Sequence, residues 1–194
     1  MPSDPVSPHC DHDCVIAATR QWLEIAVIGL NLCPFAKSVY VREQIRYVVS
    51  EATSVAQLRE DLQRELRFLS EHDPEDIDTT LLILPSVLSD FLAYNDFLQG
   101  ANRLLAKLDL EGVLQIASFH PRYQFADSNP EDIDNFTNRS PYAILHLLRE
   151  SSVDRAVMAF PDADAIVGRN ITTLRQLGRA GWDSLRLPAA PAQE

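Results

Sequence analysis

The sequence predicts an α/β protein with a small, mainly parallel sheet of about three strands and flanking helices. Short β-branched or apolar runs alternate with helical patterns, in the order strand, helix, strand, helix, strand, which is typical of parallel pairing with right-handed crossovers. The composition, 46% apolar and 23% charged residues, is that of a globular protein. One predicted strand, residues 79–85, is almost entirely apolar, which indicates a sheet covered on both faces.

A chain of 194 residues has the length of one ordinary domain. We expect a single α/β domain over residues 14–185. It lies between two disordered tails, residues 1–13 and 186–194, where proline and alanine are frequent or the chain is acidic. No linker that would divide the domain is visible between them.

The first half of the domain supplies the first strand and two helices. Residues 15–32 are expected to form a buried helix, because apolar residues occupy most of its sides. Residues 45–50, "IRYVVS", are β-branched and aromatic and predict a strand. Residues 54–70 carry leucines at helical spacing and predict an amphipathic helix.

The alternation continues through the middle of the chain. Residues 79–85 and 112–119 predict the second and third strands, with a helix between them at 88–108. The polar, irregular segment 120–138 is longer than most loops of compact domains, and such loops are usually functional or disordered. Two further helices are expected at 141–160 and 163–177, and Gly178 would end the second one.

The charge and the cysteine count restrict the function. A formal net charge of -11 without a basic block opposes binding to nucleic acid. The most apolar run, residues 22–36, is too short and too polar to span a bilayer, so no membrane partner is expected. Three cysteines do not make a disulfide framework, which favours a cytoplasmic protein.

Cys33 is the first candidate for chemistry. Proline after it disfavours the α conformation, so the first helix should stop near Leu32 and a short helix should begin at Pro34 with Cys33 at its cap. The N-terminus of that helix and Lys37, one turn later, would lower the pKa of the thiol. The alternative is a small buried side chain that packs at the end of the first helix.

His120 is the second candidate, in the segment "SFHPRYQF". It follows the third strand directly, with Arg122 and Tyr123 close behind. Ligands of open α/β sheets bind beyond the carboxyl ends of the strands. We therefore expect these three side chains to reach a site, although a structural histidine explains the same pattern.

The third candidate is the segment "NRSPYAILHLLRE", residues 138–150. Ser140 suits a helix N-cap with proline after it, and Asn138 and Arg139 precede that cap. A helix N-terminus beside an arginine would bind a carboxylate or a phosphate. His146 would lie on the polar stripe of this helix, where it is either a ligand contact or a solvated side chain.

A weaker candidate is the segment "HCDHDC", residues 9–14, which contains Cys10 and Cys14. Two histidines and two cysteines could capture a metal, but their spacing matches no standard zinc pattern. No metal site is therefore predicted from it, and the sequence indicates no particular cofactor.

Six motifs resemble the family known as domain of unknown function 1415. They are "TRQWLEIAVIGLNLCPFAK", "RYVVSEAT", "DTTLLILP", "YNDFL", "LQIASFHPRYQF" and "NRSPYAILHLLRE". The resemblance runs from Ile16 to about Trp182 and leaves the "HCDHDC" segment outside it. It implies a single-domain protein of the cytosol or of an organelle.

The leading hypothesis is an enzyme that acts on a small anionic metabolite. In this hypothesis Arg139 holds the anion, His120 is the general acid or base, and Cys33 is a nucleophile or redox thiol, while Tyr123 and Asn138 orient the substrate. One alternative is a metal-binding protein that uses Cys33 and His120. The other is a non-catalytic protein whose pocket binds a ligand or whose surface serves as a scaffold.

Overall fold

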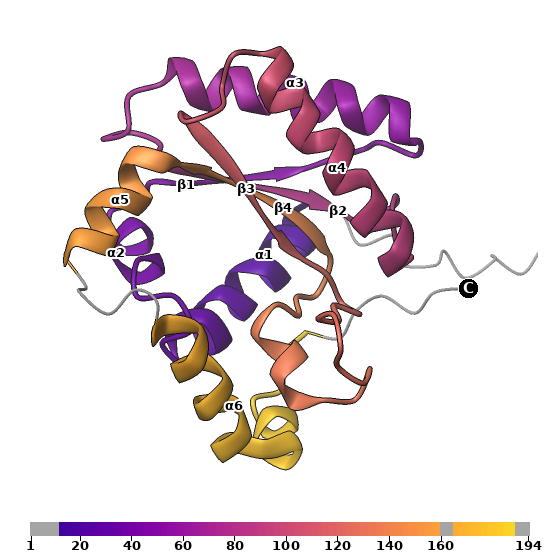
Figure 1. Ribbon diagram of the computed structural model, residues 1–194, viewed down its shortest axis with the longest axis vertical. Coiled ribbons are helices and arrows are strands. Elements are labelled where there is room, and N and C mark those ends of the chain that lie inside the picture. Colours follow the sequence, from indigo (N-terminus) through magenta and orange to yellow (C-terminus); the bar gives the residue numbers. More distant parts are fainter. Residues whose placement is uncertain (1–11, 160–164, 189–194) are drawn as a thin grey trace, which may run out of the picture.

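The computed structural model describes residues 12–159 and 165–188, which are arranged in layers around one sheet (Figure 1). In this part of the chain the sheet has four strands: β1 (Ile45–Val49), β2 (Thr79–Leu84), β3 (Leu114–Phe119) and β4 (Ala143–Arg149). The helices are α1 (His12–Trp22), the π-helix η1 (Leu23–Ile28), α2 (Ala36–Val41), α3 (Val55–Glu71), α4 (Phe91–Lys107), the 3-10 helix η2 (Ile133–Thr137), α5 (Glu150–Ala159) and α6 (Ala165–Ser184). The α/β class is therefore confirmed.

The strands lie in the order β1-β2-β4-β3. β1 pairs with β2 in parallel, whereas β4 runs antiparallel to both β2 and β3. The three predicted strands therefore run in the same direction, as expected. The sheet is nevertheless mixed, because a strand that was not predicted is inserted between the second and the third.

The prediction of one helix over residues 141–160 is wrong for its first half. Residues 143–149 form β4, and only residues 150–159 are helical, as α5. Ile144, Leu145 and Leu147 are fully buried, because β4 lies in the middle of the sheet and both of its faces are covered. Ser140 consequently precedes a strand, and the expected anion site at a helix N-terminus does not form there.

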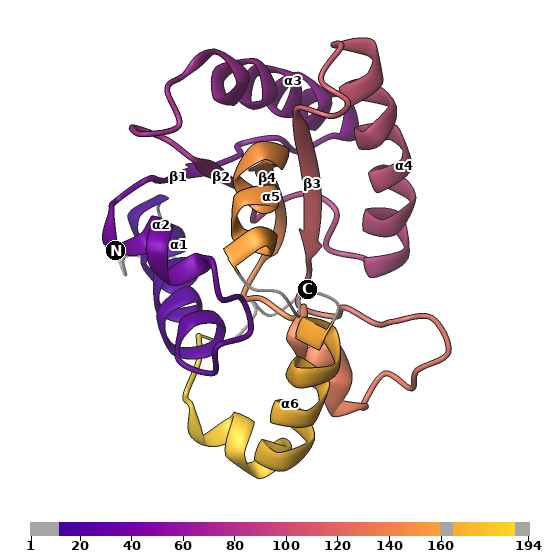
Figure 2. The ribbon, with the colours of Figure 1, turned by 60° about the vertical axis from the view of Figure 1, so that its left-hand side comes forward.

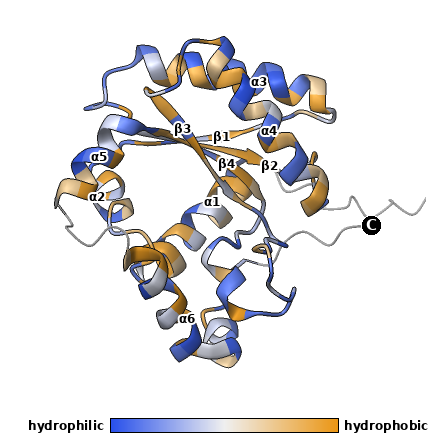
Figure 3. Cartoon of the chain, in the orientation of Figure 1, coloured by the Kyte–Doolittle hydropathy of each residue, from blue (hydrophilic) through white to orange (hydrophobic). Residues whose placement is uncertain are grey.

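One face of the sheet is covered by α3 and α4. Ser54 caps α3 by accepting a hydrogen bond from the backbone N–H of Gln57, and four leucines of α3 at helical spacing are fully buried: Leu58, Leu62, Leu66 and Leu69. They pack with Tyr94 and Phe97 of α4 against Leu82 and Leu145 of the sheet. Figure 3 shows the apolar sheet beneath helices whose outer sides are hydrophilic.

The other face of the sheet is covered by α1 and η1 at one end. Trp22 packs edge-on against Phe119 of β3, with ring centroids 5.2 Å apart, and its Nε1 donates to the carbonyl oxygen of Arg139 at 2.9 Å. The helix predicted over residues 15–32 is thus confirmed over residues 15–28, as α1 followed by η1, whereas residues 29–32 are not helical. The helices α1 and η1 cover only part of this face, and α2 and α5 lie over the remainder.

The segment 120–138 is ordered by its own hydrogen bonds. Asn135 is fully buried; its Oδ1 accepts from the N–H of Phe125 and the hydroxyl of Ser128, and its Nδ2 donates to the carbonyl of Asn129. The segment packs with α6 at the far end of the molecule from α3 (Figure 2).

The C-terminal helix begins near the expected position and is interrupted at Gly178, whose φ of 64° is not helical. Arg175 of α6 forms an ion pair with Asp134 of the 120–138 segment at 2.6 Å. At the other end of the chain, α1 already begins at His12, within the segment 1–13 that was expected to be a tail. His9 and Cys10 of the "HCDHDC" segment lie outside the described residues.

Candidate functional site

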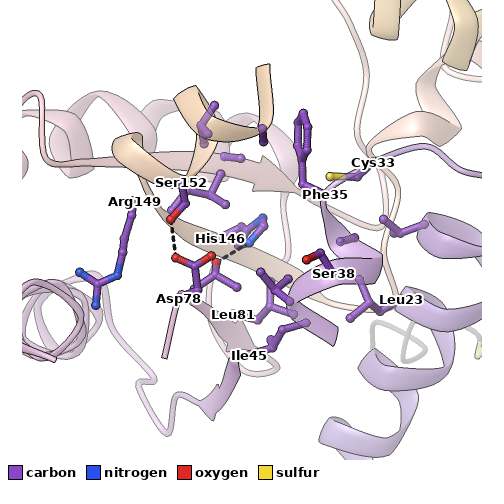
Figure 4. Close-up of a pocket in the computed structure, with 18 of the residues that line it drawn as sticks. Leu23, Cys33, Phe35, Ser38, Ile45, Asp78, Leu81, His146, Arg149 and Ser152 are labelled. Atoms are coloured by element: carbon purple, nitrogen blue, oxygen red, sulfur yellow. Dashed lines mark hydrogen bonds between the residues drawn. The ribbon is translucent and has the colours of Figure 1, made fainter. Parts of the chain in front are cut away.

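A cavity of about 470 Å³ lies against the sheet face that α1 and η1 leave uncovered. Its floor is formed by the four strands, and its walls come from η1, the 33–35 turn, α2 and α5. A volume in this range, about 300–1,000 Å³, is usual for small-molecule sites. Figure 4 shows labelled side chains from η1, the 33–35 turn, α2, α5 and the strands β1, β2 and β4 around a common space.

The strand register places His146 in the middle of this floor. On β4 it pairs with Leu81 of β2 on one side and with Ala117 of β3 on the other. The methyl group of Ala117 leaves room beside the imidazole, and the cavity occupies that room. His146 is therefore the titratable side chain at the centre of an apolar surface.

The proton of the His146 imidazole can be placed from its neighbours. The hydroxyl of Thr79 lies 2.7 Å from the carbonyl oxygen of Leu147 and 2.7 Å from Nε2 of His146. A carbonyl oxygen only accepts, so the single hydroxyl proton is donated to Leu147, and Nε2 of His146 must donate to Thr79. Nδ1 then carries the lone pair, and it has no hydrogen-bond partner among the described residues.

Burial lowers the pKa of His146 from 6.5 to about 4. An apolar environment disfavours the imidazolium, so the side chain is neutral at physiological pH. A neutral imidazole with a free Nδ1 can accept a hydrogen bond or a proton from a molecule in the cavity.

Cys33 borders the same cavity from the turn before α2, and its sulfur points inward (Figure 4). Its predicted position as the helix cap is wrong, because the N-cap of α2 is Phe35. The predicted low pKa is also wrong: burial raises the pKa of the thiol by more than backbone hydrogen bonds from Phe35 and Ala36 lower it. Desolvation outweighs two amide dipoles here.

Polar groups gather at the α5 end of the cavity. Asp78, which is buried next to β2, accepts a hydrogen bond from the hydroxyl of Ser152 on α5. Arg155 donates to the same hydroxyl at 2.9 Å. Arg149 turns its guanidinium away from the cavity (Figure 4) and donates to the carbonyl oxygens of His72 and Ile77.

His120 lies on the opposite face of the sheet from Cys33 and His146. Its ring packs between Phe91 and Tyr94 of α4 and is fully buried. Nδ1 accepts from the N–H of Arg122 at 3.0 Å, and Nε2 contacts the carbonyl oxygen of Leu88 at 3.2 Å. Both ring nitrogens are thus occupied by the backbone, and burial lowers the pKa to about 4.

Arg122 and Tyr123 stay close to His120 and outside the cavity wall. Arg122 donates to the carbonyl of Ser89 at 2.8 Å and lies 3.6 Å from the carboxylate of Asp90. The ring of Tyr123 packs against Phe91, with centroids 5.2 Å apart. These contacts fasten the start of the 120–138 segment to the N-terminus of α4.

Asn138, Arg139 and Ser140 lie on the chain between η2 and β4. Asn138 donates to the carbonyl of Ser118 at 3.1 Å. Arg139 stacks over the ring of Phe136 at 4.1 Å and donates to the carbonyl of Pro130, while the Ser140 hydroxyl donates to the carbonyl of Tyr142. All three side chains thus donate to backbone carbonyls, and none of the three residues borders the cavity.

The structure therefore brings together two of the predicted site residues, Cys33 and His146. Lys37 is exposed on α2 and does not border the cavity. Cys33 and His120, the residues of the metal-binding alternative, lie on opposite faces of the sheet. Within residues 12–159 and 165–188, no group of three or more histidine, cysteine or acidic side chains is placed to hold a metal ion.

Sequence reasoning missed the residues that make His146 a site. Thr79 and Ala117 read as ordinary strand residues, because their role depends on pairing with a strand that was predicted as a helix. Asp78 precedes the apolar run 79–85 directly, and a carboxylate at the start of a buried strand was the one local signal available for the polar end of the cavity.

The fold and the site define an α/β protein with a mixed sheet and a largely apolar cavity on one of its faces. The chain belongs to the family described as Protein of unknown function (DUF1415), whose model matches residues 14–184. Neither the curated proteins nor the solved structures gave a match. Across the described part of the chain, no helix combines the length and the apolar character needed to cross a membrane.

Proposed function

We propose that this protein is an enzyme that binds a small organic molecule in the cavity and uses Nδ1 of His146 as its proton acceptor. The proposal depends on one observation: a neutral imidazole, held through Nε2 by Thr79, borders an apolar space of about 470 Å³ and has no partner for Nδ1 among the described residues. Such convergence of an apolar pocket with a perturbed titratable group is typical of active sites.

The proton transfer that this geometry supports is simple. A hydroxyl or amine group of the bound molecule gives its proton to Nδ1, and the electron pair stays on the oxygen or nitrogen. Nε2 keeps its own proton and continues to donate it in the hydrogen bond to Thr79. The ring therefore becomes an imidazolium without rotating. An anionic group beside the ring would stabilise this imidazolium and raise the pKa of His146 towards neutrality.

The free thiol of Cys33 is a second functional group at the same cavity, and we propose that it contacts the bound molecule. Its raised pKa keeps it protonated at neutral pH, so its role is that of an apolar contact and a weak donor. The thiol also offers a chemical reporter of cavity occupancy.

The first experiment measures occupancy with N-phenyl-1-naphthylamine, a neutral apolar fluorophore. We expect its fluorescence to rise on binding and its presence to slow the labelling of Cys33 by N-ethylmaleimide. Ala117→Phe, which fills the space beside His146, and Ala156→Leu, which narrows the cavity from α5, should each abolish both effects. Two sites of substitution are used so that one misfolded variant does not decide the result.

The control is Ala106→Phe, an exposed position of α4 on the other side of the sheet, which should leave both readings unchanged. An absence of fluorophore binding together with unprotected labelling of Cys33 would show that the cavity is not a binding site. The role of His146 is tested by screening for turnover with the wild type and His146→Phe. A substrate turned over equally by both would remove the proton-transfer role.

A further inference from the structure

The charges that border the cavity differ in sign from those of the whole chain. The chain has a formal net charge of -11, yet the charged residues that border the cavity are three arginines and one aspartate: Arg42, Arg149, Arg155 and Asp78. A local reversal of charge at the entrance to a pocket attracts ligands of the opposite sign.

The buried part of this set is internally compensated. The negative charge of Asp78 attracts the positive charge of Arg149. The guanidinium of Arg149 points away from the cavity and donates to two backbone carbonyls (Figure 4). These two groups cancel within the wall of the cavity. Arg42 and Arg155 therefore remain as an excess of two positive charges.

Arg42 and Arg155 are both exposed while bordering the cavity, which places them at its opening. Arg42 follows α2 and donates through Nε to the carbonyl of Ser38, and Arg155 lies on α5 and donates to the hydroxyl of Ser152. Within the described residues, neither arginine forms an ion pair with a carboxylate. Each guanidinium therefore keeps free N–H groups that can bind a carboxylate or a phosphate in a bidentate manner.

The interior of the cavity has the opposite character. Most of the side chains that line it are apolar, among them Leu23, Val27, Leu81 and Leu148. At about 30 Å³ for each water-sized group, a volume of 470 Å³ holds roughly fifteen such groups. The space therefore suits a small molecule with an apolar body of up to about fifteen heavy atoms.

We infer that the ligand of this cavity is an amphipathic oxyanion, with its apolar body over Ala117 and His146 and its anionic group at Arg42 and Arg155. This inference rests on the proposed function, because it assumes that the cavity is the binding site. The anion stays at the opening, where it remains hydrated, and the body displaces water from the apolar floor. The hydrogen-bond donor group of the ligand that lies nearest to His146 then reaches Nδ1.

The test compares octanoate with octanol, which has the same apolar chain and no charge. Calorimetry measures both directly, and displacement of N-phenyl-1-naphthylamine provides a second reading. We expect octanoate to bind at least tenfold more tightly than octanol, a difference that one charge-assisted hydrogen bond can supply. Octyl phosphate serves as the third ligand and shows whether the site prefers a phosphate to a carboxylate.

The variant Arg42→Gln/Arg155→Gln should reduce octanoate binding to the level of octanol and leave octanol binding unchanged. Arg103→Gln, which removes one exposed positive charge on α4, should bind octanoate like the wild type. Equal binding of octanoate and octanol by the wild type would overturn the inference while leaving the cavity as a binding site. Failure of every ligand, the neutral fluorophore included, would instead refute the proposed function and with it this inference.

Discussion

The hydroxyl oxygen of Thr79 lies 2.7 Å from Nε2 of His146, so the first residue of β2 determines which nitrogen of an imidazole on β4 carries the proton. The two residues are 67 positions apart in the sequence. His120 has the same tautomer, but the N–H of Arg122 occupies its Nδ1. The two histidines therefore differ in what faces Nδ1: a backbone N–H at His120, and no hydrogen-bond partner among the described residues at His146.

Thr79→Val removes this hydroxyl and keeps the shape of the side chain. We expect Nε2 of His146 to lose its acceptor, so that the imidazole becomes a mixture of both tautomers. The imidazole ¹⁵N chemical shifts report the change, and the lost hydrogen bonds should cost about 1–2 kcal/mol of unfolding free energy. Thr79→Ser should retain the single tautomer, and a single tautomer in Thr79→Val would contradict the assignment.

The pH dependence of stability should follow the buried histidines. The pKa of His120 is about 4 in the folded protein and near 6.5 in the unfolded chain, so the unfolded chain binds more protons between these values. The unfolding free energy should therefore fall as the pH drops from 6.5 towards 4, with a slope approaching about 1.4 kcal/mol per pH unit from this residue.

Urea unfolding between pH 7 and pH 5 measures this slope. His120→Asn keeps an acceptor near the N–H of Arg122 and does not titrate, so it should be less stable at pH 7 and have a flatter profile. His72→Gln, at an exposed position, should retain the wild-type slope. A wild-type slope in His120→Asn would mean that other groups cause the acid sensitivity.

Asn135→Leu should be among the most destabilising substitutions in the 120–138 segment. It removes a fully buried amide and leaves the N–H of Phe125 and the carbonyl of Asn129 without their partners. We expect a loss of about 2–4 kcal/mol of unfolding free energy, measured in urea. Asn102→Leu, at an exposed position of α4, should change it by less than about 0.5 kcal/mol.

Arg46→Met should destabilise the protein through the carboxylate that it leaves behind. Glu65 is buried, and Nε of Arg46 lies 2.9 Å from its Oε2. Removing one partner of a buried ion pair costs about 3–5 kcal/mol, and the exposed Arg64, 3.4 Å from Oε1 of Glu65, should offset only part of this loss; the double variant Arg46→Met/Glu65→Met removes the buried charge and should recover most of it. Arg64→Met, on the exposed side of Glu65, should cost under about 1 kcal/mol. Equal losses from the two single variants would disprove this ordering.

The elements that sequence reasoning predicted correctly carry their own local signals. The helix α3 has a serine cap and leucines at helical spacing, and its face is defined without knowledge of any other element. The strand β2 is a continuous apolar run that fits only a sheet covered on both faces. In both cases the residues near in sequence determine the conformation.

The strand β4 has a misleading local signal. Ser140 and Pro141 imitate the start of a helix, and Tyr142, His146 and Arg149 have the spacing of one helical stripe. What makes residues 143–149 a strand is pairing with β2 and β3 on both sides. That stabilisation comes from residues far away in the sequence, so no local pattern contains it.

The predicted site residues lie on two different faces of the sheet because side chains alternate between these faces along β3 and the residue after it. Phe119 points to the face covered by α1, and His120, the next residue, lies on the face covered by α4. The sequence places both at the end of a strand, but it does not say which helices cover which face. Cys33 could therefore be predicted as a candidate, while its neighbour in space, His146, was placed on the wrong kind of element.

The insertion of β4 between β2 and β3 has a consequence for the folding of the protein during its synthesis on the ribosome. When residue 119 has been synthesised, the sheet of the described residues can contain its β1–β2 ladder but neither of the ladders that involve β4, so β3 lacks its partner in that sheet until residue 143 emerges. During that interval the edges of β2 and β3 that pair with β4 are unpaired. Unpaired strand edges of a nascent chain are prone to aggregate, so we expect folding to be sensitive to translation pauses and chaperones in this part of the synthesis.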